Sequence, residues 1–301
     1  MRIVATTDGS PRSLAVLPHA AAFAKASQSE LVLLRVLDPQ RDAPRSKGVP
    51  AHKRVKPIVS VWTDELRVTL DAFSIVGEPI VDVMRRGEKV HDAIARVADD
   101  AGAQMIAMSS RGAGAIRHAL IGSVAARLIG SAGLPVLTAG PLVGRPRKAR
   151  QYKILATIDD STASRDVLDA IGSYMERSSI KLFLLRVYVP TVGDRGERAE
   201  MADCRKQLRE LRNELASGVS ARAMVSHLEG LDRLDSVIPQ TAEKIGANAI
   251  AMATYGHSAG RHLLVGSTAL GVLARSRAPL ILARAEPPHV EEPARTGPSG
   301  T

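Results

Sequence analysis

The sequence predicts an α/β protein made of two repeated doubly wound domains, each with a parallel sheet flanked by helices. Short apolar runs of strand length alternate with longer segments of helical period. Runs such as residues 3–5 and 105–108 are apolar on both faces, which is typical of strands buried on both sides in a parallel sheet. The chain also repeats itself, because residues 2–10 (RIVATTDGS) match residues 153–161 (KILATIDDS).

The repeat extends over most of the chain. Residues 33–37 (LLRVL) correspond to residues 184–188 (LLRVY), and residues 105–112 (MIAMSSRG) to residues 249–256 (AIAMATYG). We therefore expect two copies of one domain, joined by a basic linker and followed by a tail rich in Pro and Gly. The expected bounds are 1–142 for copy 1, 143–151 for the linker, 152–285 for copy 2 and 286–301 for a disordered tail.

In copy 1 the apolar pattern predicts five strands and four helices in alternation. The strands are expected at residues 2–7, 30–37, 79–85, 104–109 and 135–139. The helices are expected between them, at residues 11–26, 59–73, 89–101 and 124–132. Ser10 suits the N-cap of the first helix and Pro11 its first turn. Copy 2 repeats this order.

Charge and composition exclude several classes of protein. The net charge of +10 resides in two segments: residues 39–58 carry six basic residues against one acid, and residues 143–153 carry five with none. Both contain proline and are expected to be solvated loops, and aromatic residues make up only 3% of the chain, so a nucleic-acid-binding face is not indicated. One cysteine, no span of about 20 apolar residues and no signal-peptide pattern lead us to expect a cytoplasmic protein without membrane contact.

Ligands of doubly wound domains bind beyond the carboxyl ends of the strands, so the turns after the first and fourth strands are the candidate site. In the first turn, the Asp8 carboxylate could accept hydrogen bonds from a ligand or could cap the turn; both interpretations stay open. P-loop and dinucleotide-binding motifs are absent from the sequence, as are the HExxH and CxxC metal motifs. We therefore expect no bound metal and no P-loop or Rossmann chemistry.

The segment after the fourth strand has the features of an anion site. Gly112 permits a close backbone approach, and Gly122 with Ser123 is predicted to open a helix whose N–H groups favour phosphate. The alternative is a flexible turn followed by an ordinary serine cap. Copy 2 keeps Gly256 and Gly266-Ser267 with the same nine residues between the two glycines.

A first strand that ends in Asp-Gly-Ser, followed after the fourth strand by a pattern similar to G-x2-G-x9-G-[ST], resembles the universal stress protein family in its tandem form. The resemblance implies a five-stranded sheet in the order 3-2-1-4-5. In the ATP-binding branch of the family it implies an adenine near strands 1 and 2 and phosphates on the glycine loop, with or without Mg²⁺. Matched position by position, the implied nucleotide-binding residues are Thr6, Asp8, Val36, Ser109, Arg111, Gly112, Gly122 and Ser123 in copy 1, and Thr157, Asp159, Val187, Ala253, Tyr255, Gly256, Gly266 and Ser267 in copy 2.

The chain departs from this pattern at two places. The first glycine of the loop is Ser109 in copy 1 and Ala253 in copy 2, and Asp160 stands where copy 1 has Gly9. Because Asp160 adds negative charge near a polyphosphate, we expect copy 1 to bind ATP more tightly than copy 2.

The sequence thus predicts an ATP-binding stress-response regulator without catalytic residues. A slow ATPase or other nucleotide-dependent enzyme, and a nucleotide-free stress or assembly module, remain alternatives. The last strand of each copy is a sheet edge in the family's order, so we expect the copies to pair through these strands as an intramolecular pseudo-dimer. A homodimer of whole chains is left open.

Overall fold

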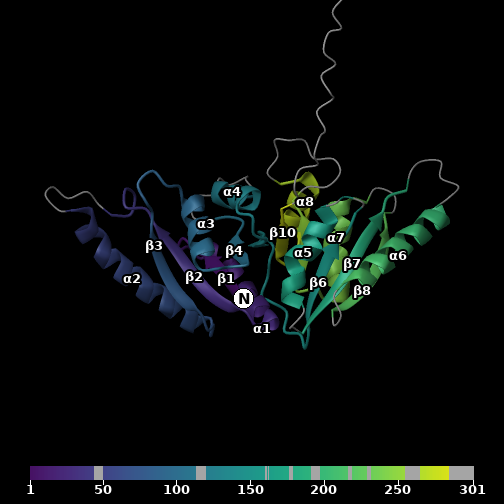
Figure 1. Ribbon diagram of the computed structural model, residues 1–301, viewed down its shortest axis with the longest axis horizontal. Helices are drawn as coiled ribbons and strands as arrows, with labels where there is room; N and C mark the ends of the chain where they lie inside the picture. Colours follow the sequence, from purple (N-terminus) through teal and green to yellow (C-terminus); the bar gives the residue numbers. More distant parts are fainter. Residues whose placement is uncertain are drawn as a thin grey trace, which may run out of the picture.

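The computed structural model describes residues 1–43, 50–112, 120–159, 161, 163–175, 179–190, 197–215, 219–228, 232–254 and 265–284. Copy 1 lies on the left of Figure 1 and copy 2 on the right. The elements of copy 1 are β1 (Arg2–Thr6), η1 (Ser13–Val16), α1 (Leu17–Ser27), β2 (Glu30–Leu37), α2 (Ala51–Ala72), β3 (Glu78–Val83), α3 (Val90–Asp100), β4 (Met105–Ser109), α4 (Ser123–Ser131) and β5 (Val136–Ala139). Those of copy 2 are β6 (Tyr152–Thr157), α5 (Ala163–Met175), β7 (Ile180–Tyr188), α6 (Glu197–Glu214), β8 (Ser220–His227), α7 (Leu234–Ile245), β9 (Ala249–Ala253), α8 (Ser267–Arg275) and β10 (Leu280–Ala283).

The strands form one ten-stranded sheet in the order β3-β2-β1-β4-β5-β10-β9-β6-β7-β8. Within each copy the order is 3-2-1-4-5 and all neighbouring strands are parallel, so the predicted fold class is confirmed. The expected contact between the last strands is present: β5 pairs antiparallel with β10, with Leu137 opposite Ile281. This pairing removes the two exposed edges that the separate copies would have had.

Two layers of helices cover the sheet. Alternate residues of each strand point to opposite faces, so Ile3 and Ala5 face one apolar layer and Val4 faces the other. The first layer packs beneath α1, α2, α5 and α6, and the second beneath α3, α4, α7 and α8. Because both layers run through the two copies, the chain has a core that is continuous across the repeat.

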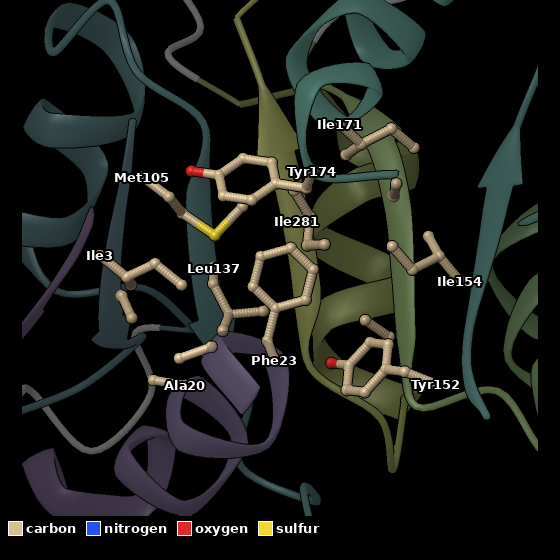
Figure 2. Close-up of a cluster of buried hydrophobic side chains, with 14 of the residues drawn as sticks. Ile3, Ala20, Phe23, Met105, Leu137, Tyr152, Ile154, Ile171, Tyr174 and Ile281 are labelled. Atoms are coloured by element: carbon tan, nitrogen blue, oxygen red, sulfur yellow. The ribbon is translucent and has the colours of Figure 1, made fainter. Parts of the chain in front are cut away.

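At the junction between the copies, aromatic rings pack among aliphatic side chains such as Leu137 and Ile281 (Figure 2). The Phe23 ring of α1 lies 5.5 Å from the Tyr152 ring and 5.1 Å from the Tyr174 ring, measured between centroids. Phe23 has no exposed surface, and full burial of such a side chain contributes about 1.5–3 kcal/mol to folding. The hydroxyls of Tyr152 and Tyr174 are buried without a hydrogen-bond partner in the part of the chain that the structure describes.

The linker is attached to both copies. His19 of α1 donates from Nε2 to the carbonyl oxygen of Gly144 at 2.7 Å in the tautomer that carries this proton, and the Asn248 side chain donates to the Arg147 carbonyl at 3.1 Å. Gly140, directly after β5, lies so close to the Leu273 carbonyl of α8 that a Cβ there would collide with it. These contacts fix the geometry of the junction on both sides of the β5–β10 pair.

Two element boundaries differ from the sequence prediction. Residues 39–58 were expected to be a loop, but α2 begins at Ala51, after extended Pro50, and carries Pro57 inside it. The added turns bury Val55, and this packing outweighs the single backbone hydrogen bond that Pro57 cannot donate. The first helix begins with η1 at Ser13 rather than at Pro11, because the preceding residues form a hydrogen-bonded turn.

Candidate functional site

The turn after β1 is held by its own side chains. The hydroxyls of Thr7 and Ser13 lie 2.7 Å apart, the Gly9 N–H donates to Thr7 Oγ1 at 3.0 Å, and the Ser10 N–H donates to Asp8 Oδ1 at 2.9 Å. Gly9 has a φ of +84°, a conformation that glycine adopts without strain. One oxygen of Asp8 therefore caps the turn. Thr6, the last residue of β1, is 8% exposed.

The two predicted turns of copy 1 meet. A Cβ on Gly112, in the segment after β4, would collide with Oδ2 of Asp8, so the backbone at Gly112 lies directly against the carboxylate. Arg111 places a buried Nε here that has no partner among the described residues. The side chain of Ser109 has a structural role: it donates to the Ser13 carbonyl at 3.0 Å and accepts from the Val16 N–H at 3.2 Å.

Helices α4 and α8 begin in the same way. Gly122 and Gly266 are their N-caps, and each glycine N–H donates at 2.7 Å to the backbone carbonyl oxygen of the residue after the fourth strand of its copy, Ser110 or Thr254. Ser123 and Ser267 are the first helical residues and are exposed. A glycine has no side chain that could accept from the first turn, so no N-cap side chain satisfies the N–H groups at either helix start. The sequence alternative of an ordinary serine cap is therefore wrong.

The turn after β6 in copy 2 repeats the first turn. Asp159 Oδ1 accepts from the Ser164 hydroxyl at 2.8 Å, from the Ser161 N–H at 3.0 Å and from the Ser161 hydroxyl. Thr157 is the half-buried end of β6, and Ala253 is the half-buried end of β9. Asp160, Tyr255 and Gly256 lie outside the described residues.

A cavity of about 390 Å³ opens beside Asp159. Its floor is the carboxyl end of β6 and β7, and its wall is one face of α6, with side chains at positions i, i+3, i+4 and i+7. The lining residues are Ile158, Asp159, Arg186, Val187, Tyr188, Val189, Glu200, Asp203, Cys204 and Gln207. Two of the predicted residues of copy 2, Asp159 and Val187, are thus brought together at one cavity.

The wall of this cavity is organised by hydrogen bonds to α6. The Tyr188 hydroxyl donates to Glu200 Oε2 at 2.8 Å, and its ring stacks on that of His227 at 5.7 Å between centroids. Arg186 donates to Gln207 Oε1 at 2.7 Å. Sequence reasoning missed the contribution of α6 to this cavity. The only signal for it was the spacing of these residues on one helical face.

Copy 1 differs at the corresponding place. The Arg35 guanidinium, which matches Arg186 in the repeat, lies 3.6 Å from the centroid of the Trp62 ring and 2.7 Å from Glu65 Oε2. It also covers the turn, since a Cβ on Gly9 would lie 2.8 Å from Arg35 Cζ. Val36 is half-buried beside it. The end of β2 is therefore covered by Arg35, whereas the end of β7 opens onto a cavity.

Within the described ranges, no group of three or more His, Cys, Asp or Glu residues has the geometry of a metal site. Cys204 is buried and is not in a disulfide. None of the described helices is both long enough and apolar enough to cross a bilayer. The candidate site therefore consists of turn backbone, two helix starts, carboxylates and arginines.

The fold and these sites define a tandem pair of doubly wound α/β domains, each with a turn and a helix start that meet at the carboxyl edge of the sheet. The sequence profile of the universal stress protein family matches residues 1–139 and 152–284. The chain belongs to this family.

Solved structures agree with the tandem fold. A universal stress protein from Archaeoglobus fulgidus DSM 4304 is 20% identical, with a TM-score of 0.64 over 94% of this chain and 98% of that one. A putative universal stress protein from Pseudomonas aeruginosa UCBPP-PA14 is 17% identical, with a TM-score of 0.57 over 94% and 92%. A search of curated proteins finds no match. At these identities the likeness concerns the fold.

Proposed function

We propose that this chain is an adenine-nucleotide-binding regulatory protein of the stress response that acts in the cytoplasm. The observation that carries the proposal is the cavity at Asp159 and Val187, the two residues to which the family resemblance assigns adenine and ribose contacts. Its volume of about 390 Å³ is within the range of small-molecule sites. The family includes ATP-binding members, which is consistent with this assignment.

The chemistry of the surrounding groups fits a nucleotide. Backbone N–H groups at the start of α8, next to Gly266 and Ser267, supply donors and a favourable dipole for phosphate. Carboxylates of the cavity wall, such as Asp203, can accept from the amino group of a base or from ribose hydroxyls. Ile158 and Val187 supply apolar surface for a planar ring. Mg²⁺, if it accompanies ATP, would be held through the phosphates.

A regulatory role is favoured over an enzymatic one. Hydrolysis requires a group that positions or deprotonates the attacking water near the γ-phosphate. The described parts of the proposed phosphate-binding segments supply glycine, serine, Arg111 and backbone N–H groups. The Asp8 carboxylate, which lies against Gly112, uses one oxygen to cap its own turn. We therefore expect nucleotide occupancy, rather than turnover, to be the signal that this protein transmits.

Two measurements test this function. Nucleotide released from the purified, heat-denatured protein should contain ATP or ADP, and calorimetry should detect binding of ATP. A chain that neither retains nor binds any nucleotide would favour the nucleotide-free module. Release of phosphate at an ordinary enzymatic rate of about 1 per second, lost when Gly122→Asp and Gly266→Asp are combined, would favour the enzyme.

A further inference from the structure

The two copies differ at the end of the site that would receive a base. We infer that copy 2 holds the one tight nucleotide site of the chain, and that in copy 1 the arginine Arg35 closes the equivalent place. This inference rests on the proposed function, and it reverses the order of affinities that Asp160 led us to expect. It is carried by the Arg35 guanidinium that lies over the turn of copy 1 and by the cavity that opens at the equivalent end of copy 2.

In copy 1, three contacts hold Arg35 over the turn. The guanidinium lies 3.6 Å from the centroid of the Trp62 ring, which is cation–π geometry. It forms an ion pair with Glu65 at 2.7 Å, and the arginine side chain is only 15% exposed. The absence of a side chain at Gly9 lets the guanidinium lie against the backbone of the turn, since a Cβ there would be 2.8 Å from Cζ. A base at this position would have to displace the arginine and break its contacts with Trp62 and Glu65.

In copy 2 the end of β7 opens onto a cavity that the equivalent arginine lines. Arg186 donates to Gln207 of α6 at 2.7 Å and lines the cavity without filling it. Helix α6 contains no aromatic residue, so it offers no counterpart of Trp62.

Copy 1 nevertheless keeps the phosphate end of a site. Gly122 begins α4 as Gly266 begins α8, and the buried Nε of Arg111 has no partner among the described residues. Copy 1 thus keeps donors for an anion, beside the Asp8 carboxylate that lies against Gly112, but no open place for a base. Any ligand in copy 1 should bind weakly and with little preference among nucleotide bases.

The decisive experiment is calorimetry with ATP on the full chain freed of bound nucleotide. We expect one tight site per chain, an affinity at least tenfold lower in Gly266→Asp, and a much smaller change in Gly122→Asp. Two equal sites per chain, or a greater loss in Gly122→Asp, would overturn the inference while leaving the proposed function intact. No binding of ATP at all would instead refute the proposed function, and the inference with it.

A second variant tests the closure itself and does not depend on how the glycine variants fold. Arg35→Ala removes the guanidinium from the turn of copy 1, and its matched control is Arg186→Ala in copy 2. We expect Arg35→Ala to raise the number of ATP molecules bound per chain from one to two, and Arg186→Ala to leave it at one or below. If Arg35→Ala leaves the stoichiometry at one, Arg35 is not what closes copy 1.

Discussion

The turn after β1 and the turn after β6 have the same origin and nearly the same hydrogen bonds. In both, one carboxylate oxygen caps the turn, that of Asp8 or Asp159, and a serine five residues later completes it. They differ in their surroundings: Arg35 covers the turn of copy 1, whereas a cavity opens beside the turn of copy 2. A turn motif thus fixes the backbone of a site, while side chains from a neighbouring strand and helix decide whether the site is open.

At the junction the two copies do not differ but share one hydrophobic core, so we expect them to unfold together. Phe23→Ala should lower the free energy of unfolding by about 4 kcal/mol, the usual cost of deleting a buried phenylalanine. Phe73→Ala is the matched control, since Phe73 is 43% exposed. Urea unfolding monitored by circular dichroism should keep a single transition for Phe23→Ala, shifted as a whole. Loss of stability in one half only would show that the copies fold independently.

Gly140 tests the same junction through its backbone. Gly140→Ala should cost roughly 2–3 kcal/mol, because a Cβ would overlap the Leu273 carbonyl and the overpacked β5–α8 contact would have to open. Gly144→Ala, in the adjoining linker, is the control: nothing lies within 4 Å of a Cβ there. Thermal unfolding of both variants should give a lower midpoint for Gly140→Ala than for Gly144→Ala. Equal stabilities of the two would contradict the tight approach of α8 to β5.

Replacing a buried tyrosine by phenylalanine should affect stability differently at the junction and at the cavity wall. Tyr174→Phe removes a buried hydroxyl that has no partner among the described residues. It should leave the free energy of unfolding unchanged or raise it by up to about 1 kcal/mol. Tyr188→Phe removes the hydrogen bond to Glu200 at the cavity wall and should cost about 1 kcal/mol. A destabilised Tyr174→Phe, measured by urea unfolding, would mean that its hydroxyl has a partner such as an ordered water.

The smallest effect concerns pH. Burial lowers the pKa of His19 below its ordinary value, against the opposing effect of its hydrogen bond to Gly144. The unfolded chain therefore binds a proton at His19 more readily than the folded chain does. The contribution of neutral His19 to stability is fully present above the ordinary pKa of about 6.5, and it is lost as the pH falls below that value towards the lower pKa of the folded chain. Between about pH 7.5 and 5.5, His19→Gln should lose less stability than the natural chain. Identical pH profiles of urea midpoints would refute this contribution.

Much of the fold was predictable because it depends on local patterns. The repeat, the alternation of strands and helices, and Gly122 and Gly266 at helix starts were all evident in the sequence, and the structure has them at the expected places. The last strands were expected to meet because each is an edge in the family's order, and the β5–β10 pair bears this out.

The features that the sequence did not predict depend on contacts between distant residues. Arg35 meets Trp62 because α2 packs over β2, a contact between distant residues that the apolar pattern of the helix does not specify. Ser109 matched a loop position in the motif, but its hydroxyl is used to hold η1. The wall of the copy 2 cavity comes from α6, whose polar residues are typical of any solvated helix face.

The central claim, an open site in copy 2 and a closed one in copy 1, can be tested by one titration of the natural chain. The chain has one cysteine and one tryptophan: Cys204 lines the cavity of copy 2, and Trp62 holds Arg35 in copy 1. We predict that ATP slows alkylation of Cys204 at concentrations that leave Trp62 fluorescence unchanged. A Trp62 response at lower ATP concentrations than the protection of Cys204, or ATP binding without any protection of Cys204, would contradict the account.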